Sequence, residues 1–162
     1  MTTVCRERKP LPPIRLIFFV LLANLISPAA VAQAASPEIE IRAVLVQWMQ
    51  DFNAGRADKV CDIFAPTLRA DNRTAPERDF EAQCKLLQKV LGDPERSYSY
   101  ALDLKEIVAE GDMAVARLVW TLTTRVKATG QVSTVEEQGL DVFGRGSDGS
   151  WRIIRFMTYE RP

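Results

Sequence analysis

The sequence contains no histidine among its 162 residues. This absence excludes hydrolases that use a histidine base, and it excludes every metal site that depends on imidazole ligands. Proton transfer near neutral pH would need a carboxyl group with a raised pKa, a tyrosine or a lysine. The sequence also lacks a glycine-rich phosphate loop and acidic residues at metal-ligand spacing. We therefore expect a protein without a metal or cofactor.

An excess of basic residues is missing as well, because 21 Lys and Arg residues balance 21 Asp and Glu residues. Nucleic-acid-binding domains usually carry a basic surface patch. We therefore expect no nucleic-acid partner.

Long apolar runs are absent too. The longest begins at Leu16 and ends at Ile26, which is shorter than the roughly 20 residues of a transmembrane helix. Basic residues precede it and small residues follow it at 30–35, the order of a cleavable secretory signal. This pattern predicts a cleaved signal peptide at 1–34, a single domain at 35–162, no stable membrane anchor and a periplasmic or secreted location. A retained signal anchor is the alternative.

Cysteine is scarce, and two of the three cysteines, Cys61 and Cys84, lie in the predicted mature domain. In an oxidising compartment an even pair usually forms a disulfide, so we predict a Cys61–Cys84 bridge. Two buried free thiols are the alternative. A redox-catalytic pair is not expected, because the C-x-x-C spacing is missing.

Helical periodicity is confined to the first part of the mature chain. Ser36 and Pro37 are typical of a helix start, and apolar residues then recur at three- and four-residue steps as far as Gly55. A shorter helix is predicted from Ala57 to Ala65, and a third from Pro76 to Leu91. Residues 67–74 are predicted to be irregular, with room for a short strand.

Beyond Pro94 the apolar residues alternate, as they do in strands. Turn signals at 110–112, 129–130 and 147–149 separate four predicted strands. Helices followed by hairpin-connected strands indicate an α+β fold, with three helices packed on one side of an antiparallel sheet.

Three segments carry a family resemblance: Val46–Gly55, Cys61–Pro66, and Leu140–Phe143 together with Asp148–Ile153. With these segments the mature chain resembles the SnoaL-like, ketosteroid-isomerase-like branch of the nuclear-transport-factor-2-like superfamily. The resemblance implies a strongly curved sheet that three helices close into a cone. It also implies a mouth that can hold a small apolar ligand. Members include isomerases, cyclases, dehydratases and non-catalytic binders, so it does not imply one activity.

In ketosteroid isomerases a tyrosine and a protonated aspartic acid form the oxyanion hole, and a second aspartate is the general base. By this resemblance Asp141 falls on the oxyanion-hole acid, Trp48 on the tyrosine and Asn72 on the base. Asparagine cannot take a proton, and Asp71 would serve only if the register shifted by one residue. Ketosteroid-isomerase chemistry is therefore not expected.

The candidate catalytic residues are Asp141 and Asp71. Asp141 is either an inward ligand-binding acid, a structural acid satisfied by backbone donors or by an arginine such as Arg117 or Arg155, or a solvent-facing acid. The expected ligand pocket consists of Trp48, Phe52, Phe64, Asn72, Tyr100, Trp120 and Phe143.

Three functions fit this pattern. The first is a protein that binds a small apolar molecule in its cone. The second is a cofactor-free isomerase, cyclase or dehydratase that uses Asp141 with Asp71. The third is a periplasmic interaction module that forms a homodimer through the outer face of the sheet.

Overall fold

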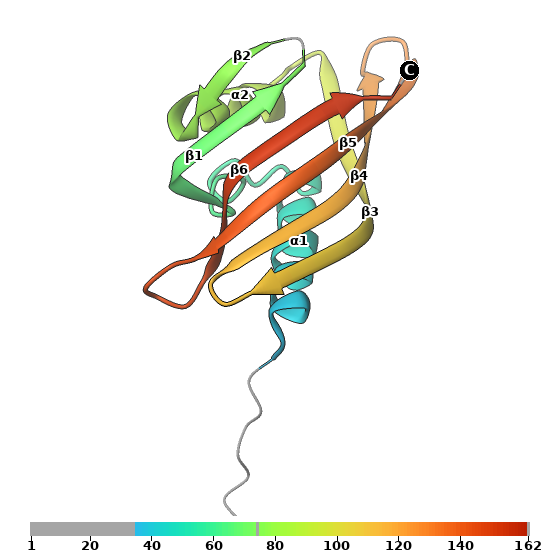
Figure 1. The fold of residues 1–162 in the computed structure, drawn as a ribbon. Coiled ribbons are helices and arrows are strands. Elements are labelled where there is room, and N and C mark those ends of the chain that lie inside the picture. The colour runs from blue at the N-terminus through green and yellow to red at the C-terminus, as the bar shows by residue number, and fades with distance from the viewer. Residues whose placement is uncertain (1–34, 74, 162) are drawn as a thin grey trace, which may run out of the picture. The chain divides into compact units, whose positions relative to one another are not determined.

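The structure, a computed structural model, describes residues 35–73 and 75–161. These residues form two helices and a six-stranded sheet, which confirms the predicted α+β class (Figure 1). The elements in chain order are α1 (Pro37–Asn53), β1 (Phe64–Asn72), β2 (Ala75–Asp79), α2 (Phe80–Leu91), β3 (Arg96–Glu110), β4 (Met113–Val126), β5 (Val132–Arg145) and β6 (Trp151–Glu160). The signal peptide predicted at residues 1–34 lies outside the described residues.

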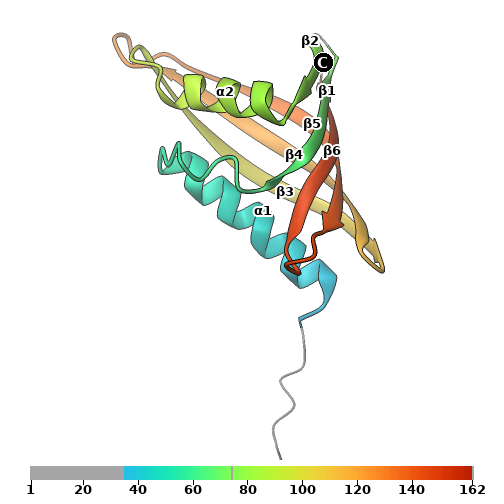
Figure 2. The same cartoon turned by 90° about the vertical axis from the view of Figure 1, so that its left-hand side faces the viewer.

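The strands are ordered β2-β1-β6-β5-β4-β3 across the sheet. Both helices lie on the same side of it (Figures 1 and 2). Neighbouring strands are antiparallel except β1 and β6, which pair in parallel. The prediction of a purely antiparallel sheet is therefore corrected at this one pair. Residues 73–150 separate β1 from β6, so no hairpin forces them to be antiparallel.

The helix predicted from Ala57 to Ala65 is replaced by consecutive turns, and the chain enters β1 at Phe64. Most of the backbone bonds here span three residues, such as Asp62 N–H to Lys59 O at 3.0 Å and Phe64 N–H to Cys61 O at 3.0 Å. A helix this short gains few hydrogen bonds for the cost of its first turn. Pairing of Phe64 with β6 ends the turns before a helix can extend.

The helix predicted from Pro76 begins instead at Phe80, after the short strand β2. The side chain of Asp79 accepts a hydrogen bond from the Ala82 N–H at 2.9 Å and caps the helix. Aspartate is among the strongest helix-capping residues, whereas Pro76 is tolerated in a strand at the sheet edge. The correction matters because it places Arg78 on the sheet.

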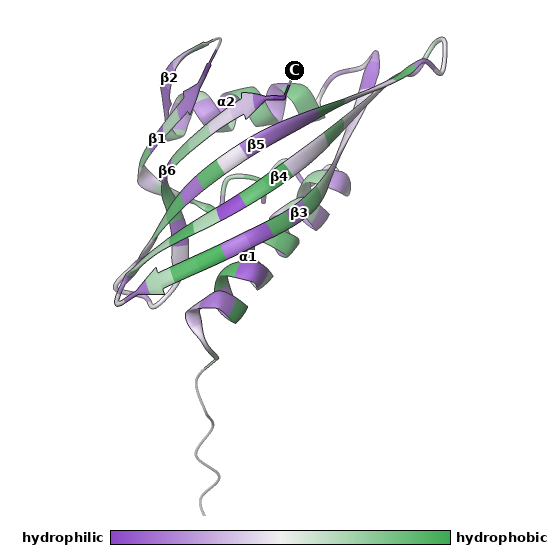
Figure 3. Ribbon diagram, turned by 45° about the vertical axis from the view of Figure 1, so that its right-hand side comes forward, coloured by the Kyte–Doolittle hydropathy of each residue, from purple (hydrophilic) through white to green (hydrophobic). Residues whose placement is uncertain are grey.

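Alternation along the long strands determines which residues face the helices. On β4, Ala114, Ala116 and Leu118 are buried, while Val115 and Arg117 are exposed. Hydrophobic and hydrophilic bands follow one another along β3, β4 and β5 (Figure 3). The largest fully buried side chains are Phe52, Phe143, Ile41, Leu45, Leu68, Leu118 and Val60. The core therefore lies between the helices and the inner face of the sheet.

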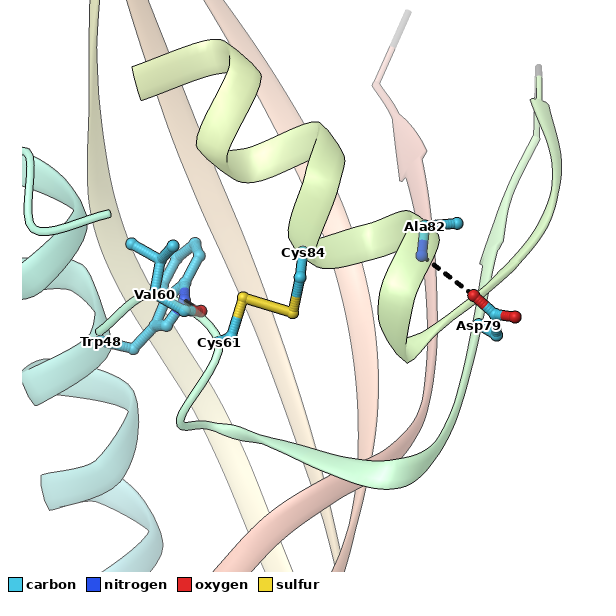
Figure 4. The surroundings of a disulfide bond; sticks show 6 residues. All are labelled: Trp48, Val60, Cys61, Asp79, Ala82 and Cys84. Carbon is cyan, nitrogen blue, oxygen red and sulfur yellow. Dashed lines mark hydrogen bonds between the residues drawn. A yellow bond between two sulfur atoms is a disulfide. The ribbon is translucent and has the colours of Figure 1, made fainter. Parts of the chain in front are cut away.

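A disulfide joins Cys61 and Cys84, whose Cα atoms are 5.6 Å apart (Figure 4). The predicted pairing is confirmed, although it connects a turn, not a helix, to α2. In the described part of the chain, neither helix has the length and apolar character needed to cross a membrane.

Candidate functional site

A cavity of about 220 Å³ lies between the helices and the sheet. Six of the seven predicted pocket residues line it: Trp48, Phe52, Phe64, Asn72, Tyr100 and Trp120. Phe143 does not, because its side chain is fully buried in the core. The prediction for Phe143 is therefore corrected, and its aromatic ring packs within the core.

Aromatic rings form one wall of the cavity. The Trp48 ring lies 5.1 Å from Trp120, 5.5 Å from Tyr100 and 5.5 Å from Phe52, measured between centroids. The Trp48–Trp120 pair is edge-to-face and the other two pairs are tilted; contacts between aromatic rings add to the gain from burial alone. The cluster connects α1 to β3 and β4 and gives the cavity a firm apolar surface.

The Trp48 indole has a structural hydrogen bond. Its Nε1–H donates to the Val60 carbonyl oxygen at 2.9 Å (Figure 4). An indole has a single donor, so Trp48 has none left for a ligand oxygen. The residue at the position of the isomerase tyrosine therefore supplies apolar surface here.

Asp141 lies on the inner face of β5, between Ala116 on β4 and Phe156 on β6. Its side chain lines the cavity and the residue is only 5% exposed. Within residues 35–73 and 75–161, no hydrogen bond or ion pair to its carboxylate is found. Burial raises the pKa of this carboxyl group to about 7.

Neither of the other two interpretations of Asp141 agrees with its surroundings. Arg117 interacts with Glu106, and Arg155 donates to the Thr67 carbonyl oxygen at 3.0 Å. The burial of Asp141 rules out a solvent-facing acid. The inward orientation is the one that the structure has.

A small polar niche borders Asp141. A Cβ atom at Gly139 would lie 3.7 Å from an Asp141 carboxyl oxygen and 2.8 Å from Leu118 Cδ1, so a side chain there would have to displace Leu118. Thr158, opposite Gly139 on β6, has a buried Oγ1 without a hydrogen-bond partner in the described chain. Asn72 is the register partner of Thr158 on β1. Gly139 thus allows Leu118 to pack closely against β5, next to the polar groups of Asp141, Thr158 and Asn72.

A second acid, Glu137, also lines the cavity. The Tyr100 hydroxyl lies 3.4 Å from its Oε2, and burial raises the pKa of Glu137 above its ordinary value. Burial, and then the nearby Glu137 charge, raise the pKa of Tyr100. Sequence reasoning missed Glu137, although its odd-numbered position places it on the face of Gly139 and Asp141.

Arg78 and Gln83 complete the polar lining and were also missed. Arg78 was assigned to a helix start, so its place on the sheet could not be inferred. The Arg78 Nε–H donates to Gln83 Oε1 at 2.8 Å.

Asp71 is the candidate that the structure separates from the site. It is exposed on β1 and does not line the cavity. The expected pairing of Asp141 with Asp71 is therefore corrected: strand alternation turns Asp71 outward, and it is Asn72 that lines the cavity. The described residues also contain no cluster of acidic and cysteine side chains that could hold a metal ion.

Comparison with known proteins identifies the family and the fold of this chain. The model of the SnoaL-like domain matches residues 45–155. A ketosteroid isomerase-like protein from Erwinia carotovora atroseptica is 21% identical, with a TM-score of 0.65 over 76% of this chain and 95% of its own. A conserved protein from Planctomyces limnophilus is 17% identical, with a TM-score of 0.71 over 77% and 96%.

An NTF2-like protein with a cystatin-like fold from Novosphingobium aromaticivorans is 17% identical, with a TM-score of 0.63 over 76% of this chain and 80% of its own. Identities this low establish the fold alone. No curated protein matches the chain.

Proposed function

We propose that this chain, which belongs to the SnoaL-like domain family, binds a small, mostly apolar ligand in the cavity between its helices and its sheet. The observation that carries the proposal is Asp141, a buried carboxyl group that lines the cavity without a partner among residues 35–73 and 75–161. An unpaired buried polar group costs stability. A ligand oxygen beside Asp141 would offset that cost.

The cavity has an apolar wall for the body of such a ligand and polar groups for its oxygen atoms. The aromatic wall around Trp48 accepts an apolar body, while Asp141 and Thr158 face its oxygen atoms. The volume of about 220 Å³ is below the roughly 300–1,000 Å³ of typical drug-sized pockets. A ligand with one or two rings, or a short chain, fits this volume.

Titration with 2-naphthol and naphthalene tests the proposal. We expect saturable quenching of tryptophan fluorescence by both, with several-fold tighter binding of 2-naphthol, because its hydroxyl can pair with Asp141 or Thr158. Thr158→Val should reduce this preference. Thr123→Val, a matched change on the strand face opposite to Trp120, should leave the preference unchanged. Absence of saturable quenching by either compound would contradict the proposal.

An enzyme that uses the same cavity is the alternative. The pKa of Asp141, about 7, lies in the range that suits a general acid or base at neutral pH. Glu137, four residues before Asp141 on the same face of β5, is a second carboxyl group for a cofactor-free isomerase, cyclase or dehydratase. It takes the place that sequence reasoning gave to Asp71.

We also propose a homodimer through the outer face of the sheet. Leu140 and Met157 are register partners on this face and are 45% and 58% exposed. Exposed apolar groups of this kind are typical of protein contacts. Sedimentation analysis is expected to give a dimer, and Leu140→Lys a monomer. A monomeric wild-type protein at micromolar concentration would contradict this proposal.

Export to an oxidising compartment is a further part of the proposal. The Cys61–Cys84 disulfide supports it, because such bonds persist mainly outside the reducing cytosol.

A further inference from the structure

Arg78 is the only lysine or arginine that lines the cavity within the described residues. It lies on β2, opposite Ala70 of β1, and is half-buried. Its Nε–H donates to Gln83 Oε1 at 2.8 Å. Gln83 is itself buried in α2, with 6% of its surface exposed. A buried amide therefore holds the guanidinium group in one orientation at the cavity wall.

Among the described residues, the remaining nitrogens of this guanidinium group have no acidic partner. In the described part of the chain no carboxylate lies within ion-pair distance of Arg78, whereas Arg56 pairs with Asp51 and Arg152 pairs with Asp148. Arginine stays charged at every physiological pH, and partial burial of an unpaired charge is costly. With its Nε engaged by Gln83, the terminal Nη1 and Nη2 groups remain available. They can bind the two oxygens of a carboxylate.

We propose that Arg78, held by Gln83, binds a carboxylate of the ligand, so that the cavity takes small amphipathic organic acids. This inference rests on the proposed ligand-binding function and narrows its ligand class. The arrangement of the sheet supports a ligand with two different ends. Arg78, Ala70, Phe156 and Asp141 are successive register partners across β2, β1, β6 and β5. The carboxylate is thus bound at Arg78, and the apolar body extends past Phe156 toward Asp141.

The two lysines that follow Arg78 in the sequence are arranged differently. Lys85 pairs with Glu81 at 2.7 Å on the exposed surface of α2. Lys89 is exposed and does not line the cavity. Lys89 is therefore a matched control: its removal changes the net charge of the same region without changing the cavity.

Cinnamate and its neutral isostere cinnamamide test the inference by isothermal titration calorimetry at pH 6, where cinnamate is ionised. We expect wild-type protein to bind cinnamate at least tenfold more tightly than cinnamamide, as a charge-assisted pair requires. Arg78→Met should abolish this preference and leave cinnamamide binding unchanged. Arg78→Lys should keep part of it, and Lys89→Met should keep all of it.

The outcomes separate this inference from the function on which it rests. Equal wild-type affinity for the two probes, or a preference that survives in Arg78→Met, would overturn the carboxylate site and leave the ligand-binding proposal standing. If Lys89→Met lost as much of the preference for cinnamate as Arg78→Met, the preference would come from the general positive charge of this region and not from direct contact with Arg78. That result would also overturn the carboxylate site. Binding of neither probe would overturn both proposals. The wild-type comparison decides the matter even if a variant does not fold.

Discussion

Asp141→Asn is expected to stabilise the folded protein at pH 8 by about 2–4 kcal/mol. Burial raises the pKa of Asp141 from 3.8 to about 7, and each unit of such a shift corresponds to about 1.4 kcal/mol. Between these two values the folded state holds a proton that the unfolded state has released. The free energy of unfolding therefore falls as pH rises from about 4 to about 7. Asparagine carries no charge, so the variant avoids this loss.

Denaturant unfolding at pH 4, 6 and 8 measures the effect. The difference between the variant and the wild type should be small at pH 4 and should reach its full size above pH 7. Asp71→Asn is the matched control, because Asp71 is exposed on β1 and its replacement should leave the pH dependence unchanged. An Asp141→Asn protein that is less stable than the wild type at pH 8 would show that the carboxylate has a stabilising partner.

The same variant bears on function. A binding site often keeps a residue that lowers stability, and Asp141 fits this description. Ionisation of Asp141 near pH 7 should make 2-naphthol binding depend on pH between 6 and 8. That dependence should disappear in Asp141→Asn.

The long strands were predictable from the sequence because alternation is a local pattern. It groups Ala114, Ala116 and Leu118 on one face of β4, and all three are buried in the structure. The inward direction of Asp141 was left open. Alternation shows which residues of one strand share a face, but it does not show which residues of the neighbouring strands lie beside them. Only the register of β4, β5 and β6 shows that Asp141 lies between Ala116 and Phe156.

The region from Ala57 to Asp79 was predicted less well, and this affected the polar residues of the cavity most. Pro76 and Asp79 both offer a helix start, and the choice depends on whether residues 75–79 pair with β1. That pairing is a tertiary contact, so local propensity could not reveal it. The error removed Arg78 and Gln83 from the predicted site. It also left Asp71 and Asn72 without a strand that would fix their directions.

Removal of the Cys61–Cys84 disulfide is expected to lower the free energy of unfolding by about 3 kcal/mol. The two cysteines are 23 residues apart, and a loop of this size gives about that value on the chain-entropy model. For a domain of this length, the melting temperature should fall by about 10 °C. Alanine suits both positions, because Cys84 is nearly buried and serine would add an unpaired hydroxyl.

The position of the bond extends its effect to the cavity. Cys61 follows Val60, whose carbonyl oxygen accepts the Trp48 hydrogen bond (Figure 4). Cys84 follows Gln83, which accepts the hydrogen bond from Arg78. The double variant Cys61→Ala/Cys84→Ala should therefore bind 2-naphthol and cinnamate more weakly even at temperatures where it remains folded.

Reducing agent provides the internal control. It should lower the melting temperature of the wild type to that of the double variant and should leave the variant unchanged. Equal stability of oxidised and reduced wild type would contradict the prediction. Natural domains are stable by only about 5–15 kcal/mol, so about 3 kcal/mol is a large share of the total. A chain that depends on this bond would fold poorly in a reducing cytosol, and this links the proposed export of the protein to the stability of its ligand site.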